Sequence, residues 1–369
     1  MRFPEFSGEW EETTLGKISE ITKGSGISKD QLSEQGSPCI LYGELYTKYK
    51  SEVIDEVYSR TELDSSSLVK SKANDVIIPC SGETAIDIST ARCVPHDNIL
   101  LGGDLNIIRL KHDDGGFFAY QLNGTRKKDI ARVAQGVSVV HLYGENLKHI
   151  RVYHPAIEEQ KKITRLLSLI DERIATQNKI IKKYESLIKG ITQHCIKKST
   201  SGSIYAKLGD ICQITTGKLD ANAQVDNGIY PFFTCAEQPF KIDNFAFDTE
   251  ALLISGNGAN LGYINYYKGK FNAYQRTYVL DLFSENIQYI KWALKVLLPK
   301  RIAIEKSSSN TPYIVLSTLT DLRLPIPCKS EQSFIANLMQ SLERKLSNQI
   351  ALYDSYNYLK QYLLRQMFI

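Results

Sequence analysis

Cysteine and histidine side chains are the first candidates for chemistry in this chain, because both can ligate a metal and cysteine can act as a nucleophile. The 369-residue sequence contains seven cysteines and six histidines. The cysteines are scattered, and no two of them form a C-x-x-C pair. The histidines form no metal or catalytic constellation. We therefore interpret the cysteines as reduced thiols and predict no metal site.

Two short motifs favour an enzymatic interpretation that their surroundings do not support. The stretch "SGNGANLG" (255–262) is rich in glycine, but no βαβ unit with a following acidic residue surrounds it, so a turn between strands is favoured. The stretch "NTPY" (310–313) differs at Thr311 from the N-P-P-Y tetrapeptide that holds a flipped base in adenine methyltransferases. No cofactor-binding glycine loop accompanies it. We expect a chain that is not an enzyme, with a fused methyltransferase as the less favoured alternative.

Basic residues are clustered, although the formal net charge is only +4. Compact clusters can bind a phosphate backbone even when the whole chain is nearly neutral. The candidates for phosphate contacts are Arg126, Lys127, Lys128, Lys300 and Arg301. A solvated helix surface is an equally open interpretation for each cluster.

The elements that would position such side chains begin with a helix between Ile163 and Ile191. Apolar residues repeat there in a 4-3 alternation that is typical of a coiled coil. At about 1.5 Å per residue, such a helix would be about 42 Å long. Its apolar positions are Ile163, Leu167, Ile170, Ile174, Ile181, Tyr184, Ile188 and Ile191. Gln177 is the one polar residue on this stripe.

An internal repeat supplies a second helix of the same kind, offset by 172 residues, between Ile335 and Leu363. Gln349 aligns with Gln177, and Lys360 is a further polar position on the second stripe. Two such stripes in one chain predict an antiparallel coiled coil with a pseudo-twofold repeat. A buried glutamine pair at Gln177 and Gln349 would lower stability but fix the register. The alternative is that both side chains point to solvent.

Each helix follows a globular region of short β-rich runs. "TTLGKISEITKG" (13–24) and "AKLGDICQITTG" (206–217) begin the two regions in the same way. Strands are expected in 75–82, 106–111, 137–143, 251–258, 277–283 and 313–317, and helices in 116–134 and 285–305. Strands and helices do not alternate regularly, so we predict an α+β fold rather than a doubly wound sheet.

Domain bounds follow from this repeat. The expected bounds are 1–154 and 203–326 for the globular domains and 155–202 and 327–369 for the helices. The sequence has no apolar run long enough for a membrane span and no signal peptide, so a cytoplasmic location is expected.

The start of each helix carries a shared pattern of apolar residues, a proline and a Glu-Gln pair. Its residues are Leu147, Ile150, Val152, Pro155, Glu159, Gln160 and Ile163, and again Leu319, Leu322, Leu324, Pro327, Glu331, Gln332 and Ile335. With the opening "FPEFSGEWEETTLGKI", this arrangement resembles the specificity subunit of type I restriction-modification systems. The second copy lacks the "FPEF" lead-in, which leaves the start of its domain open by several residues.

The resemblance implies that each globular domain is a target recognition domain for one half of a bipartite sequence in double-stranded DNA. It implies that the coiled coil sets the spacer and docks two methyltransferase subunits, and that restriction subunits join the full complex. It also implies no cofactor in this chain, with S-adenosylmethionine, ATP and Mg²⁺ bound by the partner subunits. A coiled-coil scaffold without DNA readout is the rival hypothesis, and salt-sensitive DNA binding would separate the two.

Candidate DNA contacts are the polar residues of four turns that occur in both halves, because such side chains read base edges. In the first half they are Lys23, Ser25, Ser28, Ser81, Glu83, Thr84, Asp104, Asn106, Gln135 and Ser138. In the second half they are Lys218, Asn222, Asn257, Asn260, Gln275, Arg276, Ser309, Asn310 and Tyr313.

Overall fold

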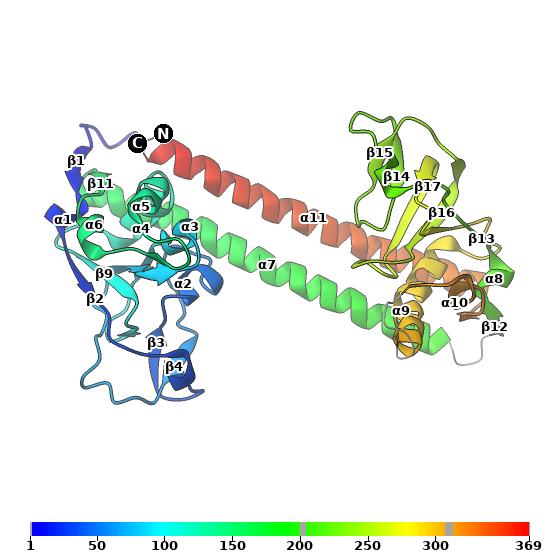
Figure 1. Cartoon of the computed structure of the whole chain (residues 1–369), viewed down its shortest axis with the longest axis horizontal. Helices are drawn as coiled ribbons and strands as arrows, with labels where there is room; N and C mark the ends of the chain where they lie inside the picture. Colours follow the sequence, from blue (N-terminus) through cyan, green and yellow to red (C-terminus); the bar gives the residue numbers. More distant parts are fainter. Residues whose placement is uncertain (1, 200–203, 307–312, 369) are drawn as a thin grey trace. The chain divides into compact units, whose positions relative to one another are not determined.

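The structure is a computed structural model that describes residues 2–199, 204–306 and 313–368. It divides into two compact units, each with a globular part and a share of both long helices (Figure 1). The first unit comprises Met1–Lys179 and Ala351–Ile369, and the second comprises Ile180–Ile350. Among the described residues, no helix has the length and apolar character that a membrane crossing requires.

The two long helices are α7 (Ile157–Ser199) and α11 (Lys329–Met367), and both extend beyond the apolar stripes that predicted them. In the first unit, Leu167 of α7 and Leu363 of α11 belong to one buried core. In the second unit, Ile196 of α7 and Met339 of α11 do the same. The start of α7 thus packs with the end of α11 and the reverse holds in the other unit, so the helices run antiparallel, as the sequence predicts.

The first unit contains a four-stranded antiparallel sheet in the order β2-β9-β5-β7 and a three-stranded sheet in the order β4-β3-β8. Two-stranded pairs join β1 to β11 and β6 to β10. The strands are β1 (Glu11–Thr14), β2 (Ser19–Lys23), β3 (Ser37–Ile40), β4 (Ser59–Thr61), β5 (Asp75–Pro79), β6 (Ser81–Gly82), β7 (Arg92–Val94), β8 (Leu100–Leu101), β9 (Leu105–Leu110), β10 (Val140–His141) and β11 (Arg151–His154). The helices are α1 (Leu15–Ile18), η1 (Lys29–Gln31), α2 (Glu44–Thr47), α3 (Ala85–Ile88), α4 (Gly115–Asn123), α5 (Lys127–Val133) and α6 (Gly144–Lys148).

The second unit contains one six-stranded sheet in the order β13-β18-β16-β17-β14-β15, and β12 pairs with β19. Its strands are β12 (Ile204–Lys207), β13 (Gln213–Thr216), β14 (Tyr230–Phe233), β15 (Phe240–Ile242), β16 (Phe247–Ser255), β17 (Ile264–Ala273), β18 (Thr277–Asp281) and β19 (Arg323–Ile326). Its helices are α8 (Leu208–Ile211), η2 (Ala221–Ala223), α9 (Ile287–Lys306) and α10 (Leu316–Thr320). The long strand β17 pairs with both β16 and β14. The second unit therefore has one large sheet where the first unit has two smaller ones.

The "LG" that recurs in both halves marks a close approach between α1 and α6, and between α8 and α10. A Cβ atom at Gly16 would lie 2.8 Å from the Cβ of Lys148, and one at Gly209 would lie 3.0 Å from the Cβ of Thr320. Beside these glycines, the amide of Leu15 donates to Ile150 O at 3.0 Å and the amide of Leu208 donates to Leu322 O at 2.9 Å. Glycine is needed because the two backbones pack without room for a side chain.

Buried glutamines fasten the start of both long helices. Gln160 Nε2 donates to Pro155 O at 2.9 Å, and its Oε1 accepts from the amide of Asp114 at 2.9 Å. Gln332 Nε2 donates to Pro327 O at 2.9 Å, and its Oε1 accepts from the amide of Asn286 at 3.0 Å. The Glu-Gln pattern therefore has a structural cause: each glutamine satisfies buried backbone groups just before a long helix and just before α4 or α9.

Some predicted elements differ from the structure. The helix expected over 116–134 is interrupted between Asn123 and Lys127, where Gly124 ends α4. The strand expected over 313–317 is wrong, since 313–315 form no strand and α10 begins at Leu316. Only Val140–His141 of the run 137–143 is a strand, because Val137 is 98% exposed and has no neighbouring strand to pack on. Short β-branched runs favour strands only where a partner is present.

Candidate nucleic-acid interface

Four turns meet at one end of the four-stranded sheet of the first unit. These first-unit turns are residues 23–28, 81–84, 104–106 and 135–138. The amide of Cys80 donates to Asp104 O at 2.7 Å, and the amide of Leu142 donates to Cys80 O at 2.7 Å. The amide of Gly24 donates to Leu105 O at 3.0 Å. Segments distant in the sequence are therefore joined through their backbones.

The second unit brings the matching turns together with the same bonds. These second-unit turns are residues 218–222, 257–260 and 275–276, and Tyr313 is the one described candidate of the fourth predicted turn. The amide of Gly256 donates to Arg276 O at 2.8 Å, and the amide of Ile314 donates to Gly256 O at 2.9 Å. The amide of Gly217 donates to Thr277 O at 3.3 Å. Both units thus carry one cluster of turns at one end of the main sheet.

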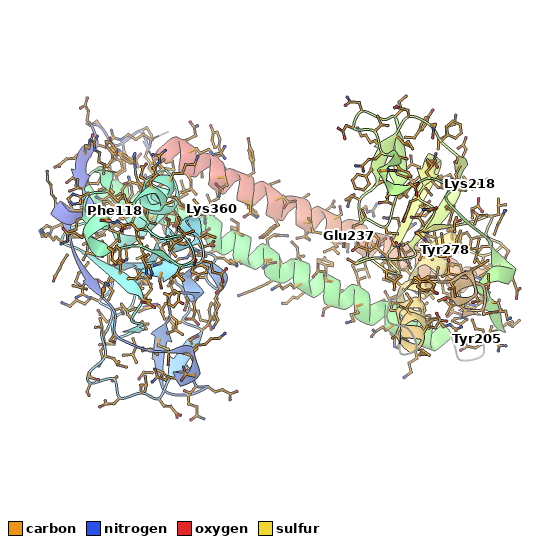
Figure 2. All side chains as sticks on the ribbon, in the orientation of Figure 1. Phe118, Tyr205, Lys218, Glu237, Tyr278 and Lys360 are labelled. Carbon is orange, nitrogen blue, oxygen red and sulfur yellow. The ribbon has the colours of Figure 1, made fainter. Side chains whose placement is uncertain are left out.

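Most of the predicted side chains are accessible at these two clusters. The exposed ones are Lys23, Ser28, Glu83, Thr84, Asp104, Gln135 and Ser138 in the first unit, and Lys218, Asn222, Gln275, Arg276 and Tyr313 in the second. Ser25, Asn257 and Asn260 are partly buried. Figure 2 shows Lys218 on the second unit. Ser309 and Asn310 lie outside the described residues.

Asn106 and Ser81 are buried, which the sequence could not show. Asn106 is 0% exposed, and its Nδ2 donates to Leu142 O at 2.9 Å. Ser81 lies in β6, where it is paired with His141. Ser25 has a similar structural role, since its Oγ accepts from the amide of Val69 at 2.8 Å. These side chains hold the turns in place, so we do not assign them contacts with a ligand.

Several exposed turn residues are already oriented by neighbours. Thr84 caps α3 by accepting from the amide of Asp87 at 3.1 Å. Gln275 Nε2 donates to Asp220 Oδ1 at 2.7 Å, and Asn260 Nδ2 donates to Cys235 O at 3.0 Å. A side chain held in this way loses less conformational entropy when it binds a partner.

The basic clusters contain residues in different environments. Arg126 stacks over the ring of Tyr153, 5.0 Å from its centroid, and pairs with Asp129. Arg301 pairs with Glu305 at 2.8 Å. Lys127 is partly buried, and burial lowers the pKa of its ammonium group. The cluster residues that are exposed are Lys128 and Lys300.

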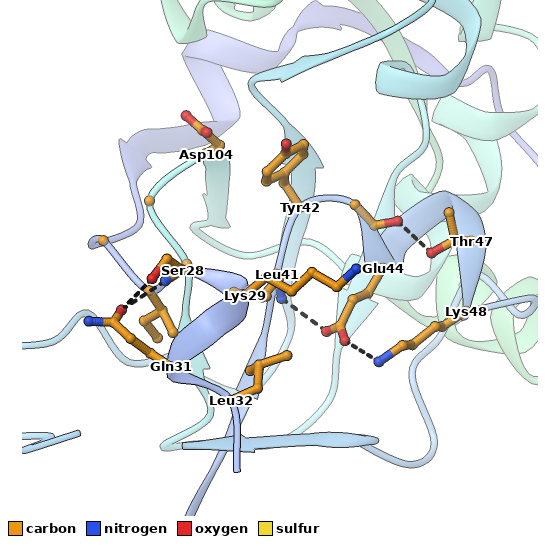
Figure 3. A pocket seen from close by; sticks show the side chains of 15 residues that line it. Ser28, Lys29, Gln31, Leu32, Leu41, Tyr42, Glu44, Thr47, Lys48 and Asp104 are labelled. Carbon is orange, nitrogen blue, oxygen red and sulfur yellow. Dashed lines mark hydrogen bonds and ion pairs between the residues drawn. The ribbon is translucent and has the colours of Figure 1, made fainter. Parts of the chain in front are cut away.

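A hollow of about 960 Å³ opens beside the first-unit turns and contains residues that sequence reasoning missed. Ser28 and Asp104 line it together with Lys29, Tyr42 and Lys48 (Figure 3). The last three belong to the segment between β2 and β4, which has no counterpart motif in the second half. Only their position next to Ser28 in space identifies them, because the repeat could not.

The two glutamines of the apolar stripes differ in exposure. Gln177 is 5% exposed and belongs to the first unit, whereas Gln349 is partly buried and belongs to the second. Burial of Gln177 argues against the alternative in which this side chain points freely to solvent.

Three of the thiols, those of Cys39, Cys80 and Cys93, are buried, whereas Cys328 is exposed. Burial raises the pKa of both Cys39 and Cys80 to about 11, so neither is a reactive thiolate near neutral pH. No group of three or more potential metal ligands occurs within the described ranges.

The chain matches, over residues 7–186 and again over 202–352, the family described as the type I restriction modification DNA specificity domain. It therefore belongs to that family and contains two DNA specificity domains, which are recognition components and not catalytic ones. The resemblance stated from the sequence is confirmed.

Individual relatives agree with this assignment. Over 136 residues, the chain is 43% identical to the type I restriction enzyme EcoDI specificity subunit of Escherichia coli, covering 37% of this chain and 30% of that one. It is 22% identical to the MjaVIII specificity subunit of Methanocaldococcus jannaschii, covering 93% of this chain and 87% of that one. With the MjaIX specificity subunit of the same organism, the match covers 61% of each chain. The chain thus aligns with less than two thirds of the EcoDI and MjaIX subunits.

A solved structure shares the fold. The crystal structure of a type I restriction-modification S subunit from M. genitalium superposes with a TM-score of 0.71 at 19% identity, covering 100% of this chain and 99% of that one. The expected α+β fold with two long helices is confirmed.

Proposed function

We propose that the two turn clusters read the two halves of a bipartite sequence in double-stranded DNA, within a type I restriction-modification complex. The observation that supports this most directly is the same backbone connection among turns in both units, combined with different side chains on them. A shared scaffold with divergent polar residues suits two readers of unlike base sequences. In this proposal residues 1–154 and 203–326 are the target recognition domains.

Base contacts are assigned to the exposed turn residues. Arg276 and Lys218 are the strongest candidates of the second unit, because Arg and Lys donate to the major-groove edge of guanine. In the first unit, Lys23 and Ser28 belong to the turn that matches the turn of Lys218. Asp104 belongs to the turn that matches the turn of Arg276, and it suits the amino group of cytosine. The hollow lined by Lys29, Tyr42 and Lys48 extends this surface.

Phosphate contacts are assigned to Lys128 and Lys300, since both are exposed and belong to basic clusters. Such contacts position the protein on the duplex without reading its sequence. Replacing either lysine should weaken binding about equally for all sequences and make binding less sensitive to salt.

Helices α7 and α11 would set the spacer between the half-sites and dock two methyltransferase subunits, with restriction subunits joining the full complex. In this proposal residues 155–202 and 327–369 form the coiled coil, and Gln177 and Gln349 fix its register. S-adenosylmethionine, ATP and Mg²⁺ would be bound by the partner subunits. A structure described as showing complex assembly and conformational transition of a type I restriction-modification system has the same fold, with a TM-score of 0.58 at 16% identity.

The experiment is a methylation map of DNA from cells that express this chain with a matched pair of type I methyltransferase subunits. We expect a two-part N6-methyladenine motif that is absent without this chain. Arg276→Ala should relax one position of one half-site, at a cost of about 1–3 kcal/mol, and leave the other half-site unchanged. Glu237→Ala, an exposed change outside the turns (Figure 2), is the matched control.

A second experiment tests the helices. Inserting one heptad into both α7 and α11 should lengthen the unread spacer between the half-sites. An unchanged spacer in an intact complex would contradict the ruler role. No two-part motif from an intact complex would leave the coiled-coil scaffold as the better hypothesis.

A further inference from the structure

A polar pocket of about 540 Å³ lies within the first unit, between the last turns of α11 and the globular part. It is separate from the first-unit turns, and no role has been assigned to it so far. Basic side chains reach it from several elements. Its charged and hydroxyl-bearing lining includes Lys50, Asp87, Thr125, Lys127 and Arg365.

Arg92 is the residue that makes this pocket unusual. Its side chain lines the pocket although the residue is only 7% exposed. Nε donates to Leu45 O at 3.1 Å and Nη2 donates to Tyr49 O at 2.9 Å. Within the described part of the chain, Arg92 makes no ion pair, and Nη1 makes no hydrogen bond to protein. Burial lowers the pKa of Arg92, although Glu52 and Asp171 oppose this from beyond ion-pair distance. A buried guanidinium without a direct carboxylate contact is costly unless an anion compensates it.

Two lysines at the pocket, Lys127 and Lys50, also lack an ion pair. Lys127 Nζ reaches only Thr90 Oγ1, at 3.3 Å, and burial together with the nearby charge of Arg92 lowers its pKa. Lys50 Nζ donates to Thr47 O at 3.3 Å. Neither lysine makes an ion pair in the ranges that the structure describes. The positive charge is thus concentrated on side chains that lack an acidic partner.

The acidic groups at the pocket offset this charge only in part. Lys360 of α11 pairs with Glu52 at 2.5 Å and with Asp171 at 2.6 Å, and these two carboxylates also attract the charge of Arg92. Asp87 accepts from Thr84 Oγ1 at 2.6 Å. Among the described lining residues, Asp87 is therefore the one acidic residue that no ion pair neutralises. The basic lining residues around it include Lys50, Arg92, Lys127 and Arg365. The local field favours an anion.

We propose that this pocket binds a phosphate group through Arg92, Lys127 and Arg365. A phosphate carries enough negative charge for several cations, and the planar guanidinium can donate to two of its oxygens. Thr125 Oγ1 has no hydrogen-bond partner in the structure and adds a neutral donor. Because Arg365 and Lys360 belong to α11, the bound anion fastens the last turns of that helix to the globular part.

The test titrates the intact chain with inorganic phosphate and pyrophosphate at constant ionic strength, followed by calorimetry and by thermal denaturation. We expect saturable binding and a rise in Tm that follows mass action. Lys127→Gln should weaken binding about tenfold, as expected for the loss of one charge-assisted hydrogen bond. Lys72→Gln is the matched control, because Lys72 is an exposed lysine of the same unit that neither lines the pocket nor has an assigned DNA contact.

Arg365→Gln provides a second variant at an exposed helix position, where misfolding is not expected. It should weaken binding without lowering the Tm of the ligand-free protein. Non-saturable effects in the wild type, or equal losses in the Lys127→Gln and Lys72→Gln variants, would overturn the proposal.

Competition identifies the source of the phosphate. Displacement of pyrophosphate by a short DNA duplex would assign the site to a backbone phosphate, and retention would assign it to a free phosphate compound. Both outcomes support a phosphate site. The result is independent of base reading, because Lys127→Gln leaves every exposed turn residue intact and the methylation motif reports on those residues alone.

Discussion

The two long helices begin with the same contacts, but each uses the acidic residue on its buried face differently. In the first unit, Asp171 of α7 is buried, accepts from Tyr120 Oη at 2.7 Å and pairs with Lys360 at 2.6 Å. In the second unit, the side chain of Glu343 of α11 is 35% exposed and pairs with Lys291 at 2.8 Å. Asp171 and Glu343 occupy the same position in the repeat, whereas their burial and their partners differ.

This difference separates the scaffold of the repeat from its local adaptations. The glutamines and glycines of the scaffold bond to backbone groups or pack against them, so they are needed wherever the same backbone recurs. The ionic groups bond to side chains, which are free to change between copies. Lys360 contacts Asp171 and Glu52 together, and thereby joins α11 to both α7 and the first globular part.

Removing Lys360 should produce the largest effect. Lys360→Met leaves Asp171 and Glu52 as adjacent buried carboxylates without their cation. We expect the first unit to lose about 3–5 kcal/mol of its free energy of unfolding. Native-state hydrogen exchange measures this separately in each unit, since a chain with two units need not unfold in one step.

The neighbouring change Gln361→Ala is the control, because Gln361 is exposed on the same helix. It should alter the first unit by no more than about 0.5 kcal/mol. Equal protection of the first unit in wild type and Lys360→Met would show that this ionic cluster does not stabilise it.

The shared glutamines should give the next largest effect, and it should be the same in both units. Gln160→Leu leaves the amide of Asp114 and the carbonyl of Pro155 buried without partners, and Gln332→Leu does the same to Asn286 and Pro327. We expect about 2–4 kcal/mol of destabilisation of the unit that carries the change. Hydrogen exchange of α4 and α9 amides measures the two cases side by side.

Replacement by glutamate is the informative companion. Gln160→Glu keeps the acceptor but removes the donor and places a charge next to Asp113, which Gln160 Nε2 contacts at 2.8 Å. It should cost at least as much as Gln160→Leu. A large cost in one unit and none in the other would break the equivalence of the two junctions.

Sequence patterns were sufficient for the parts of the fold that depend on periodic burial. The apolar stripes predicted both long helices, and the offset of 172 residues matched Gln160 to Gln332 before any contact was known. The stripe also showed that Lys360 is a polar residue at an apolar position, but it did not show what this side chain contacts. Its partners Glu52 and Asp171 are distant in sequence, and only folding brings them together.

The candidate site was less predictable for the same reason. Exposed residues such as Lys218 and Arg276 were found because turns can be recognised locally. The burial of Asn106 could not be predicted, because a polar residue at a strand end can face either way, and here its Nδ2 donates to Leu142 O from within the core. The pocket at Arg92 left no local signal, since its lining comes from elements that are far apart in the chain.

Acidic pH should sharpen the contrast between Asp171 and Glu343. Burial raises the pKa of Asp171 from 3.8 to about 6, against the opposing charge of Lys360. The folded state then binds a proton at a higher pH than the unfolded chain. This carboxyl group therefore costs stability above about pH 6, and the cost is relieved as the pH falls toward 4.

We expect Asp171 to contribute a gain on the order of 2 kcal/mol in the first unit between pH 7 and pH 4, relative to the Asp171→Asn variant. Glu172→Gln, an exposed neighbour, should leave the pH profile unchanged. Parallel profiles for wild type and Asp171→Asn would mean that the carboxyl group titrates normally in the folded protein.

The smallest effect should follow from Glu343→Gln in the second unit. Its carboxylate pairs with Lys291 and, at 3.2 Å, with Lys295, but a partly exposed carboxylate is screened by solvent. An amide can still accept a hydrogen bond from Lys291, so we expect a loss of no more than about 1 kcal/mol. Lys291→Met should cost more than Glu343→Gln, because Lys291 is buried and its Nζ lies 5.0 Å from the centroid of the Trp292 ring. If Glu343→Gln instead cost as much as Lys360→Met, the acidic position would be a shared structural requirement of both helices, and the distinction between a repeated backbone scaffold and local ionic contacts would fail.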